Sequence, residues 1–196
     1  MPVAKRRTNL ERSSTTRAGL LASAREAFVT RGYADTSTPD LAEAAGVTRG
    51  ALYHHFADKQ ALFRAVIEAE AAAVAAEIEA APSSGSPIAA LVAGGEAYLQ
   101  AMAAPGRTRL LLIDAPSVLG GEEVDAIDGR NGVRTLREGL QAAAEAGALR
   151  PVPIEQTAQL LGAAYDRAAL ALAGGGDRTD WLAALRGMIE GLALPR

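Results

Sequence analysis

Residues 36–56 of this 196-residue chain read TSTPDLAEAAGVTRGALYHHF, and this stretch decides how the first part of the protein folds. Thr38 is a favourable N-cap, and Pro39 suits the first position of a helix, where no N–H is needed. Gly46 is typical of a helix C-terminus because glycine adopts the left-handed conformation without strain. Thr48 can then cap a second helix. The stretch therefore predicts two short helices joined by a tight turn, a helix-turn-helix.

The second of these helices has two different faces. Leu52 and Phe56 are four residues apart and can anchor one face to the core, which leaves the other face polar. Arginine on such a face can donate two hydrogen bonds to guanine, and hydroxyl and imidazole groups can contact phosphate. Lysine at the start of the following helix can also bind phosphate. We therefore predict DNA contacts from Thr38, Thr48, Arg49, Gly50, Tyr53, His54 and Lys59. The alternative is a hairpin of an ordinary helical bundle whose polar residues face water.

The segment TPDLAEAAGVTRGALYHHFADK, residues 38–59, resembles the DNA-binding signature of the TetR family of transcriptional regulators. The resemblance extends over about residues 14–70, and the rest of the chain is similar to the family only in its helical layout. It implies a small DNA-binding domain followed by a larger helical domain that dimerises and holds a small ligand. It also implies repression of transcription, although an activator would show the same sequence features.

Charge is divided unevenly along the chain. Residues 1–64 hold 10 Lys and Arg against 6 Asp and Glu, a balance of +4, and residues 65–196 hold 10 against 17, a balance of −7. The basic part therefore coincides with the helix-turn-helix, as DNA binding requires. Residues 1–13 form a basic arm that can reach a minor groove or phosphates, or remain a solvated tail. Its cationic residues are Lys5, Arg6, Arg7 and Arg12.

The remaining pattern is helical throughout, so we expect an all-α fold of about nine helices. No alternating strand pattern is present. We expect a basic flexible arm over residues 1–13, a DNA-binding domain over 14–58, and a ligand-binding and dimerisation domain over 59–196. Besides the helix-turn-helix, the predicted helices cover residues 14–31, 59–80, 87–103, 107–119, 122–146, 154–173 and 178–193. Residues 82–87, PSSGSP, read as a linker.

The last two predicted helices are joined by three glycines, residues 174–176, and should form an antiparallel hairpin. Apolar residues occur on more than one face of each helix, and the family resemblance implies that such a hairpin pairs with its symmetry mate. A hairpin buried within one subunit is the alternative. We favour a homodimer, because one helix reads too few base pairs and a two-fold dimer demands a palindromic operator.

A ligand site in the second domain is harder to place. Asp114 follows the apolar run 110–113 and is expected to be half-buried, so its carboxylate needs a partner. The partner is either an arginine, such as Arg134, Arg137 or Arg167, or a nearby helix N-terminus, or else the carboxylate orients a ligand hydroxyl or cation. The predicted ligand-binding residues are Tyr98, Met102, Leu111, Asp114 and Tyr165. Because the chain has few aromatic residues after residue 64, we expect a small apolar ligand rather than a quaternary cation held in an aromatic cage.

The leading hypothesis is a cytoplasmic homodimeric repressor that a small ligand releases from a palindromic operator. A constitutive regulator whose larger domain only dimerises is the alternative. The chain lacks cysteine and has two adjacent histidines, so we expect no metal site, and we expect no cofactor. We find no phosphate loop or nucleophile motif, so we do not expect an enzyme. No apolar run is long enough to cross a membrane.

Overall fold

The structure is a computed structural model that describes residues 9–82 and 85–195. The described residues form helices and, apart from an isolated bridge between Leu149 and Ala193, no β-structure, which confirms the all-α fold class. No helix among the described residues is long and apolar enough to span a bilayer. The chain divides into two compact units, Met1–Ile67 and Glu68–Arg196, which are described separately.

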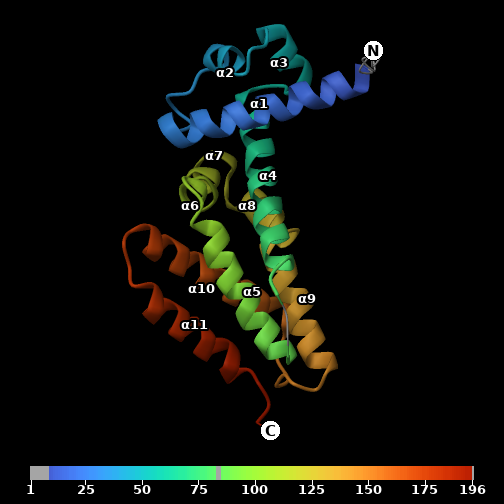
Figure 1. Ribbon diagram of the computed structural model, residues 1–196, viewed down its shortest axis with the longest axis vertical. Coiled ribbons are helices and arrows are strands. Elements are labelled where there is room, and N and C mark those ends of the chain that lie inside the picture. The colour runs from blue at the N-terminus through green and yellow to red at the C-terminus, as the bar shows by residue number, and fades with distance from the viewer. Residues whose placement is uncertain (1–8, 83–84, 196) are drawn as a thin grey trace, which may run out of the picture. The chain divides into compact units, whose positions relative to one another are not determined.

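The first unit contains three helices and the start of a fourth (Figure 1): α1 (Asn9–Arg31), α2 (Thr38–Ala44), α3 (Arg49–His55) and α4 (Lys59–Glu79). An aromatic cluster lies at its centre. The ring of Phe28 lies 5.1 Å from that of Phe63 and 5.9 Å from that of Tyr33, between ring centres. The other fully buried large side chains of this unit include Leu20, Leu41, Leu52, Leu62 and Ile67. Together these residues hold α1, α2, α3 and α4 around one small core.

Two helix starts differ from the sequence prediction. Helix α1 begins at Asn9 rather than Ser14, so part of the predicted arm is helical, while residues 1–8, with Lys5, Arg6 and Arg7, lie outside the described residues. The N-cap of α2 is Ser37 rather than Thr38, so Pro39 occupies the second position of the helix. Ser37 accepts a hydrogen bond from the Asp40 amide and the Asp40 side chain bonds back to the Ser37 amide, a reciprocal capping box that Thr38 could not form with this spacing.

The second unit holds the rest of α4 and the remaining helical segments. These are α5 (Pro87–Met102), α6 (Arg107–Arg109), the π-helix η1 (Leu110–Asp114), α7 (Ala115–Leu119), α8 (Gly121–Gly129), α9 (Gly132–Glu145), α10 (Ile154–Ala173) and α11 (Arg178–Gly191). Residues 83–84 of the predicted linker lie outside the described residues. Figure 1 shows α10 and α11 as neighbours joined by the short glycine turn, with α5 next to them. Their inner faces bury side chains such as Leu99, Leu161, Leu185 and Ile189.

Two predicted helices of this unit are more complex than expected. The run over residues 107–119 contains a π-helical turn, in which the Ala115 amide bonds to the Leu110 carbonyl. Pro116 follows and has no N–H to donate, which favours such a local rearrangement. The predicted helix over 122–146 divides into α8 and α9, because Asn131 has a non-helical backbone (φ −126°, ψ −99°).

Candidate DNA-binding interface and ligand cavity

The turn between α2 and α3 is fixed by hydrogen bonds at both helix ends. Gly46 has a φ of 66°, as the sequence predicts for a left-handed C-terminal residue. Its amide donates to the Glu43 carbonyl, and the amide of Val47 donates to the Ala42 carbonyl, both at 2.9 Å. Thr48 caps α3 as predicted, accepting from the Ala51 amide at 3.1 Å. These hydrogen bonds hold α3 in a defined orientation relative to α2.

Helix α3 presents the predicted polar face outward. Leu52 is fully buried and Phe56 is buried behind it, so the opposite side of the helix is free. The exposed residues on and next to that side are Thr48, Arg49, Gly50, Tyr53 and His54. A Cβ added at Gly50 would meet only the Thr48 hydroxyl, at 3.9 Å, so the backbone is open at this point. Arg49 forms no ion pair with another described residue, which leaves its guanidinium available.

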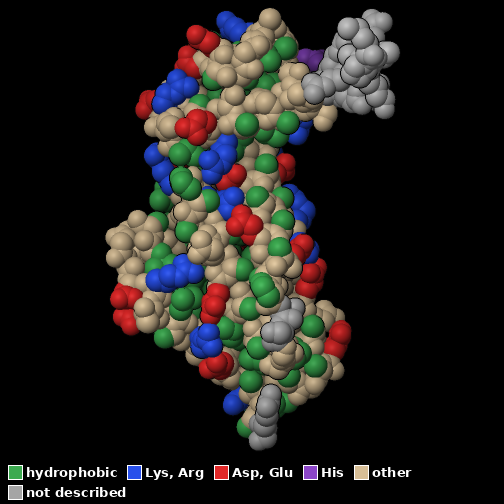
Figure 2. All heavy atoms as spheres, in the orientation of Figure 1, with side chains coloured by type: hydrophobic (Ala, Val, Ile, Leu, Met, Phe, Trp, Pro, Cys, Tyr) green, Lys and Arg blue, Asp and Glu red, His purple; other side chains and the backbone are tan. Residues whose placement is uncertain are grey.

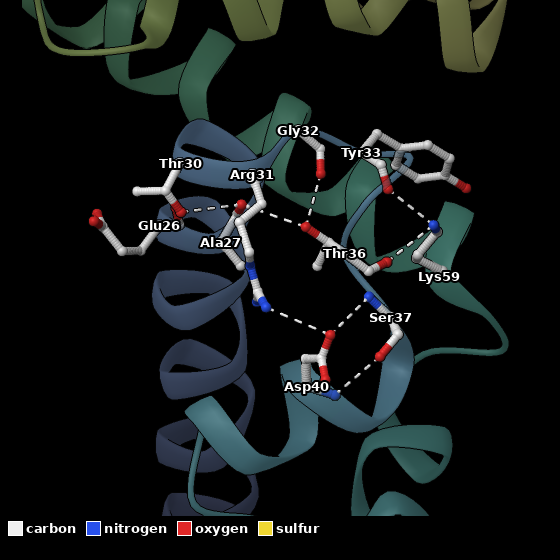
Figure 3. A network of polar contacts seen from close by, with 10 residues as sticks. All are labelled: Glu26, Ala27, Thr30, Arg31, Gly32, Tyr33, Thr36, Ser37, Asp40 and Lys59. Atoms are coloured by element: carbon white, nitrogen blue, oxygen red, sulfur yellow. Dashed lines mark hydrogen bonds and ion pairs between the residues drawn. The ribbon is translucent and has the colours of Figure 1, made fainter.

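Lys59, which we predict to contact phosphate, has a structural role that the sequence did not suggest. Its Nζ donates to the carbonyl oxygens of Tyr33 at 2.9 Å and Thr36 at 3.0 Å (Figure 3). The same ammonium lies 4.1 Å from the centre of the Tyr33 ring, a cation–π distance. Lys59 therefore ties the start of α4 to the connection between α1 and α2. Its contact with phosphate stays a prediction, and so does that of the partly exposed Thr38.

The connection between α1 and α2 is stabilised by further polar contacts, which Figure 3 shows together. The buried hydroxyl of Thr36 donates to the Gly32 carbonyl at 2.7 Å, and Gly32 ends α1 with a φ of 81°. Arg31 pairs with Asp40 of the capping box at 3.4 Å. Hydrogen bonds with Ser37 are the main reason why the pKa of Asp40 lies below its ordinary value, and the charge of Arg31 lowers it further. These contacts position α2, and through the turn α3, on α1.

The second unit contains a cavity of about 280 Å³, bordered by α4, α5, α8, α9 and α10. Most of its wall is apolar, with Ile78, Leu91, Val133 and Leu136 among the larger side chains. Glycines shape it: a Cβ at Gly95 would fall 1.8 Å from the Tyr165 hydroxyl, and one at Gly139 would fall 2.7 Å from Leu91. The cavity therefore depends on the close approach of backbone and side chains, and its volume lies just below the roughly 300–1,000 Å³ that is typical of small-molecule sites.

Two tyrosines and two carboxylates supply polar groups to this wall. The Tyr98 hydroxyl donates to Oδ1 of Asp166 at 2.5 Å, and the rings of Tyr98 and Tyr165 lie 5.8 Å apart, edge to face. Burial raises the pKa of Tyr165 to about 12. Asp128 accepts hydrogen bonds from the backbone amides of Gly132 and Val133, at the start of α9.

Both carboxylates have unusual protonation behaviour. Burial, with repulsion from Asp166, raises the pKa of Asp128 to about 6, although the two amide bonds act in the opposite direction. Burial also raises the pKa of Asp166, and the Tyr98 hydrogen bond partly offsets this. Perturbed carboxylates in a cavity are common at functional sites.

The structure brings together only part of the predicted ligand set. Tyr98 and Tyr165 line the cavity, whereas Met102, Leu111 and Asp114 do not. Met102 is buried in the hydrophobic core and Leu111 packs against that core.

The charged partner of Asp114 is an arginine, but not one of the three named from the sequence. Oδ2 of Asp114 is buried and lies 3.4 Å from Nε of Arg109 without a hydrogen bond. Two of the named arginines have other partners, since Arg134 pairs with Glu79 and Glu138, and Arg137 pairs with Glu155.

Asp128 and Asp166 line the cavity but are not among the ligand-binding residues predicted from the sequence. Asp166 directly follows Tyr165 in a helix with a clear apolar stripe, and Asp128 precedes the helix break at Asn131. Neither position identifies a cavity residue by itself, because α8 and α10 border one cavity only in the folded chain.

Comparisons with known proteins agree with this architecture. The family model described as "Bacterial regulatory proteins, tetR family" matches residues 20–66, and the one described as "Tetracyclin repressor-like, C-terminal domain" matches residues 88–193, more than half of the chain. The chain belongs to the TetR family. A solved TetR-family transcriptional regulator from Pectobacterium atrosepticum is 35% identical, with a TM-score of 0.75 over 97% of this chain and 100% of that one.

Curated relatives match over about a third of the chain. The transcriptional regulator TtgR from Pseudomonas putida is 48% identical over 63 residues, 32% of this chain and 30% of TtgR. The transcriptional repressor AcnR from Corynebacterium glutamicum is 38% identical over 65 residues, 33% of this chain and 35% of AcnR. The match thus spans about a third of the length of these relatives.

Proposed function

We propose that this TetR-family protein is a sequence-specific DNA-binding transcriptional repressor. The observation that carries the proposal is the outer face of α3, where exposed Arg49 and Tyr53 flank the open backbone of Gly50. A helix held rigidly by its caps can enter a major groove, with arginine reading a guanine and the hydroxyl groups contacting phosphate. Repression is proposed because AcnR, which matches a third of the chain, is a repressor.

We further propose that the protein acts as a homodimer through α10 and α11. Leu160 is 71% exposed and Met188 is 47% exposed, so each helix carries an apolar side chain that the subunit does not bury. A second copy packed against both helices would remove this surface from water. A two-fold dimer places its two α3 helices in successive major grooves, about 34–36 Å apart, and therefore reads a palindromic operator.

We propose that a small ligand in the cavity releases the repressor. Ile78 and Glu79 of α4 border the cavity, and the same helix begins at Lys59 in the DNA-binding unit. Near the cavity, Arg107 clamps α4 by binding Glu70 at 3.0 Å and Glu77 at 2.8 Å. A ligand that favours another position of α4 would change the distance between the two α3 helices of the dimer, which then would no longer match the operator. A coupling of about 1–3 kcal/mol would change operator affinity by roughly 5–150-fold.

Selection of duplexes from a random library tests the DNA-binding part of the proposal. We expect enrichment of an inverted repeat, bound at two subunits per duplex, with an affinity that falls steeply as salt is raised. Recovery of no common sequence, or of a single asymmetric half-site bound by one subunit, would contradict it. Figure 2 shows acidic and basic side chains interspersed on the face drawn there, so that face has no continuous basic surface that would attract DNA of any sequence.

A further inference from the structure

All charged side chains that line the cavity in the second unit are acidic among the described residues. Four carboxylates contribute to its wall, namely Glu79, Asp128, Glu138 and Asp166, while no Lys, Arg or His among the described residues lines it. Glu79 and Glu138 are both paired with Arg134. Within the described part of the chain, neither Asp128 nor Asp166 has an ion-pair partner. The cavity therefore holds negative charge that the protein itself leaves unbalanced.

The hydrogen bonds that these two carboxylates do accept come from neutral donors. Asp166 accepts from the Tyr98 hydroxyl, and Asp128 accepts from backbone amides at the start of α9. Such bonds orient the carboxylates but do not cancel their charge. A partly buried carboxylate without a counter-charge is costly, so a cation that entered the cavity would gain more there than at the protein surface.

The rest of the cavity wall determines what kind of uncharged group the ligand carries. Leu91, Val133 and Leu136 offer aliphatic contacts, and the rings of Tyr98 and Tyr165 offer faces and edges at the carboxylate end. Aromatic rings next to carboxylates attract a cation further, because the ring face is electronegative. A ligand matched to this wall is apolar over most of its length and carries its charge at one end.

We propose that the ligand of this cavity is an amphiphilic cation, such as a hydrophobic amine in its protonated form, whose positive end lies against Asp166 and Asp128. The inference rests on the proposed function of the cavity as the regulatory site, and it replaces the purely apolar ligand expected from the sequence. Two carboxylates from α8 and α10 supply the charge complement, and the aliphatic wall of α5 and α9 receives the tail.

Three probes of equal length test the charge requirement: 4-phenylbutylamine, 4-phenylbutanol and 4-phenylbutyrate, titrated calorimetrically into the full-length protein without DNA. Near neutral pH the first is a cation, the second is neutral and the third is an anion. We expect the amine to bind at least about tenfold more tightly than the alcohol, or roughly 1.4 kcal/mol, and the carboxylate to bind most weakly. Equal affinities, a preference for the carboxylate, or no binding of any probe would overturn the inference.

Neutral isosteres identify the charges involved. Asp166→Asn keeps an acceptor for Tyr98 and Asp128→Asn keeps one for the α9 amides, so each removes charge with little change of shape. We expect each variant to lower the amine-to-alcohol affinity ratio by about fivefold or more while alcohol affinity changes much less, since the neutral hydroxyl keeps a hydrogen-bond acceptor in the amide and loses no charge attraction. Glu122→Gln, an exposed charge change on the same helix α8, is the matched control and should leave the ratio as it is.

The design separates this inference from the proposed function. If the ratio stays constant in Asp166→Asn and Asp128→Asn, the charge assignment is wrong, whatever the protein does on DNA. If the amine binds as expected but the protein selects no DNA sequence, the ligand class stands and the repressor proposal fails. A variant that no longer binds the alcohol has lost the cavity, and the other variant then decides the outcome.

Discussion

The hydroxyl of Tyr98 on α5 donates a 2.5 Å hydrogen bond to Oδ1 of Asp166 on α10. Burial, the charge of Asp166 and this hydrogen bond raise the pKa of Tyr98 above its ordinary value, and the bond lowers the pKa of Asp166 against the larger effect of burial. The pair therefore keeps a carboxylate oriented inside a mostly apolar cavity. The second carboxylate, Asp128, faces the same cavity and feels the charge of Asp166.

Asp128 should make the stability of the second unit depend on pH. Its pKa is raised on folding from 3.8 to about 6, so folding disfavours the ionised form. The folded state therefore gains stability from the protonated form of Asp128. This gain is fully present below about pH 4 and is lost as the pH rises through about 6. Asp128→Asn cannot ionise, so its free energy of unfolding relative to the wild type should rise between pH 4 and pH 7, by at most about 3 kcal/mol.

Urea denaturation at a series of pH values measures this difference. Asp166 and Asp125 are the charged groups that add to burial in raising the pKa of Asp128, and Tyr98 interacts with it as well. All of them are present in both proteins, so their contributions largely cancel in the comparison. A stability difference that does not change with pH would show that Asp128 is ionised equally easily in the folded and unfolded chain.

Lys59 and Arg49 should separate stability from DNA binding. Lys59→Met leaves the carbonyls of Tyr33 and Thr36 without their charged donor, and we expect a loss of about 1.5–3 kcal/mol in stability. Arg49→Met removes an exposed cation that forms no ion pair with another described residue, so its stability should stay within about 0.5 kcal/mol of the wild type. Thermal unfolding of the two variants makes the comparison. Equal stability of both variants would remove the structural role assigned to Lys59.

Gly50 should matter for DNA but not for folding. A Cβ at this position meets no neighbour closer than 3.9 Å, and Gly50 lies in a helix, so Gly50→Ala should be neutral or stabilising by about 0.5–1 kcal/mol. If the α3 backbone approaches the duplex closely, the added methyl group weakens operator binding. Fluorescence anisotropy with the selected duplex measures this. Unchanged affinity would mean that the backbone of α3 stays clear of the DNA at this residue.

Leu160 tests the proposed dimer. Leu160→Asp places a charge on the exposed face of α10 without disturbing the core, and we expect the sedimentation coefficient to fall to that of a monomer. Ile113→Asp is the matched control, because Ile113 is 54% exposed on η1, away from α10 and α11 in sequence. A dimer that survives Leu160→Asp, or one lost equally in both variants, would argue against the α10–α11 interface.

The local parts of this structure were predictable from sequence because their causes are local. The left-handed Gly46, the Thr48 cap and the buried Leu52 depend on neighbours within a few residues. The same reasoning chose Thr38 over Ser37 as the cap of α2, since both residue types are good caps and only the reciprocal bond with Asp40 decides between them.

The cavity was not predictable in the same way. Asp128 and Asp166 lie more than thirty residues apart in the sequence, on α8 and α10, and their surroundings exist only after α8, α9 and α10 pack. Asp114 was the more conspicuous carboxylate in the sequence because it follows an apolar run. Its side chain is instead held near Arg109, one turn earlier, where a π-helical turn that the sequence pattern did not reveal places it.

The most direct test of the central claim is selection of DNA sequences by the wild type and by Arg49→Ala in parallel. The account predicts that the variant still folds and still selects an inverted repeat, but loses its preference at one base pair in each half-site, where affinity falls by about 1–3 kcal/mol. The same base preference at every position in the two proteins would contradict the assignment of α3 and Arg49 as the part of the protein that reads DNA.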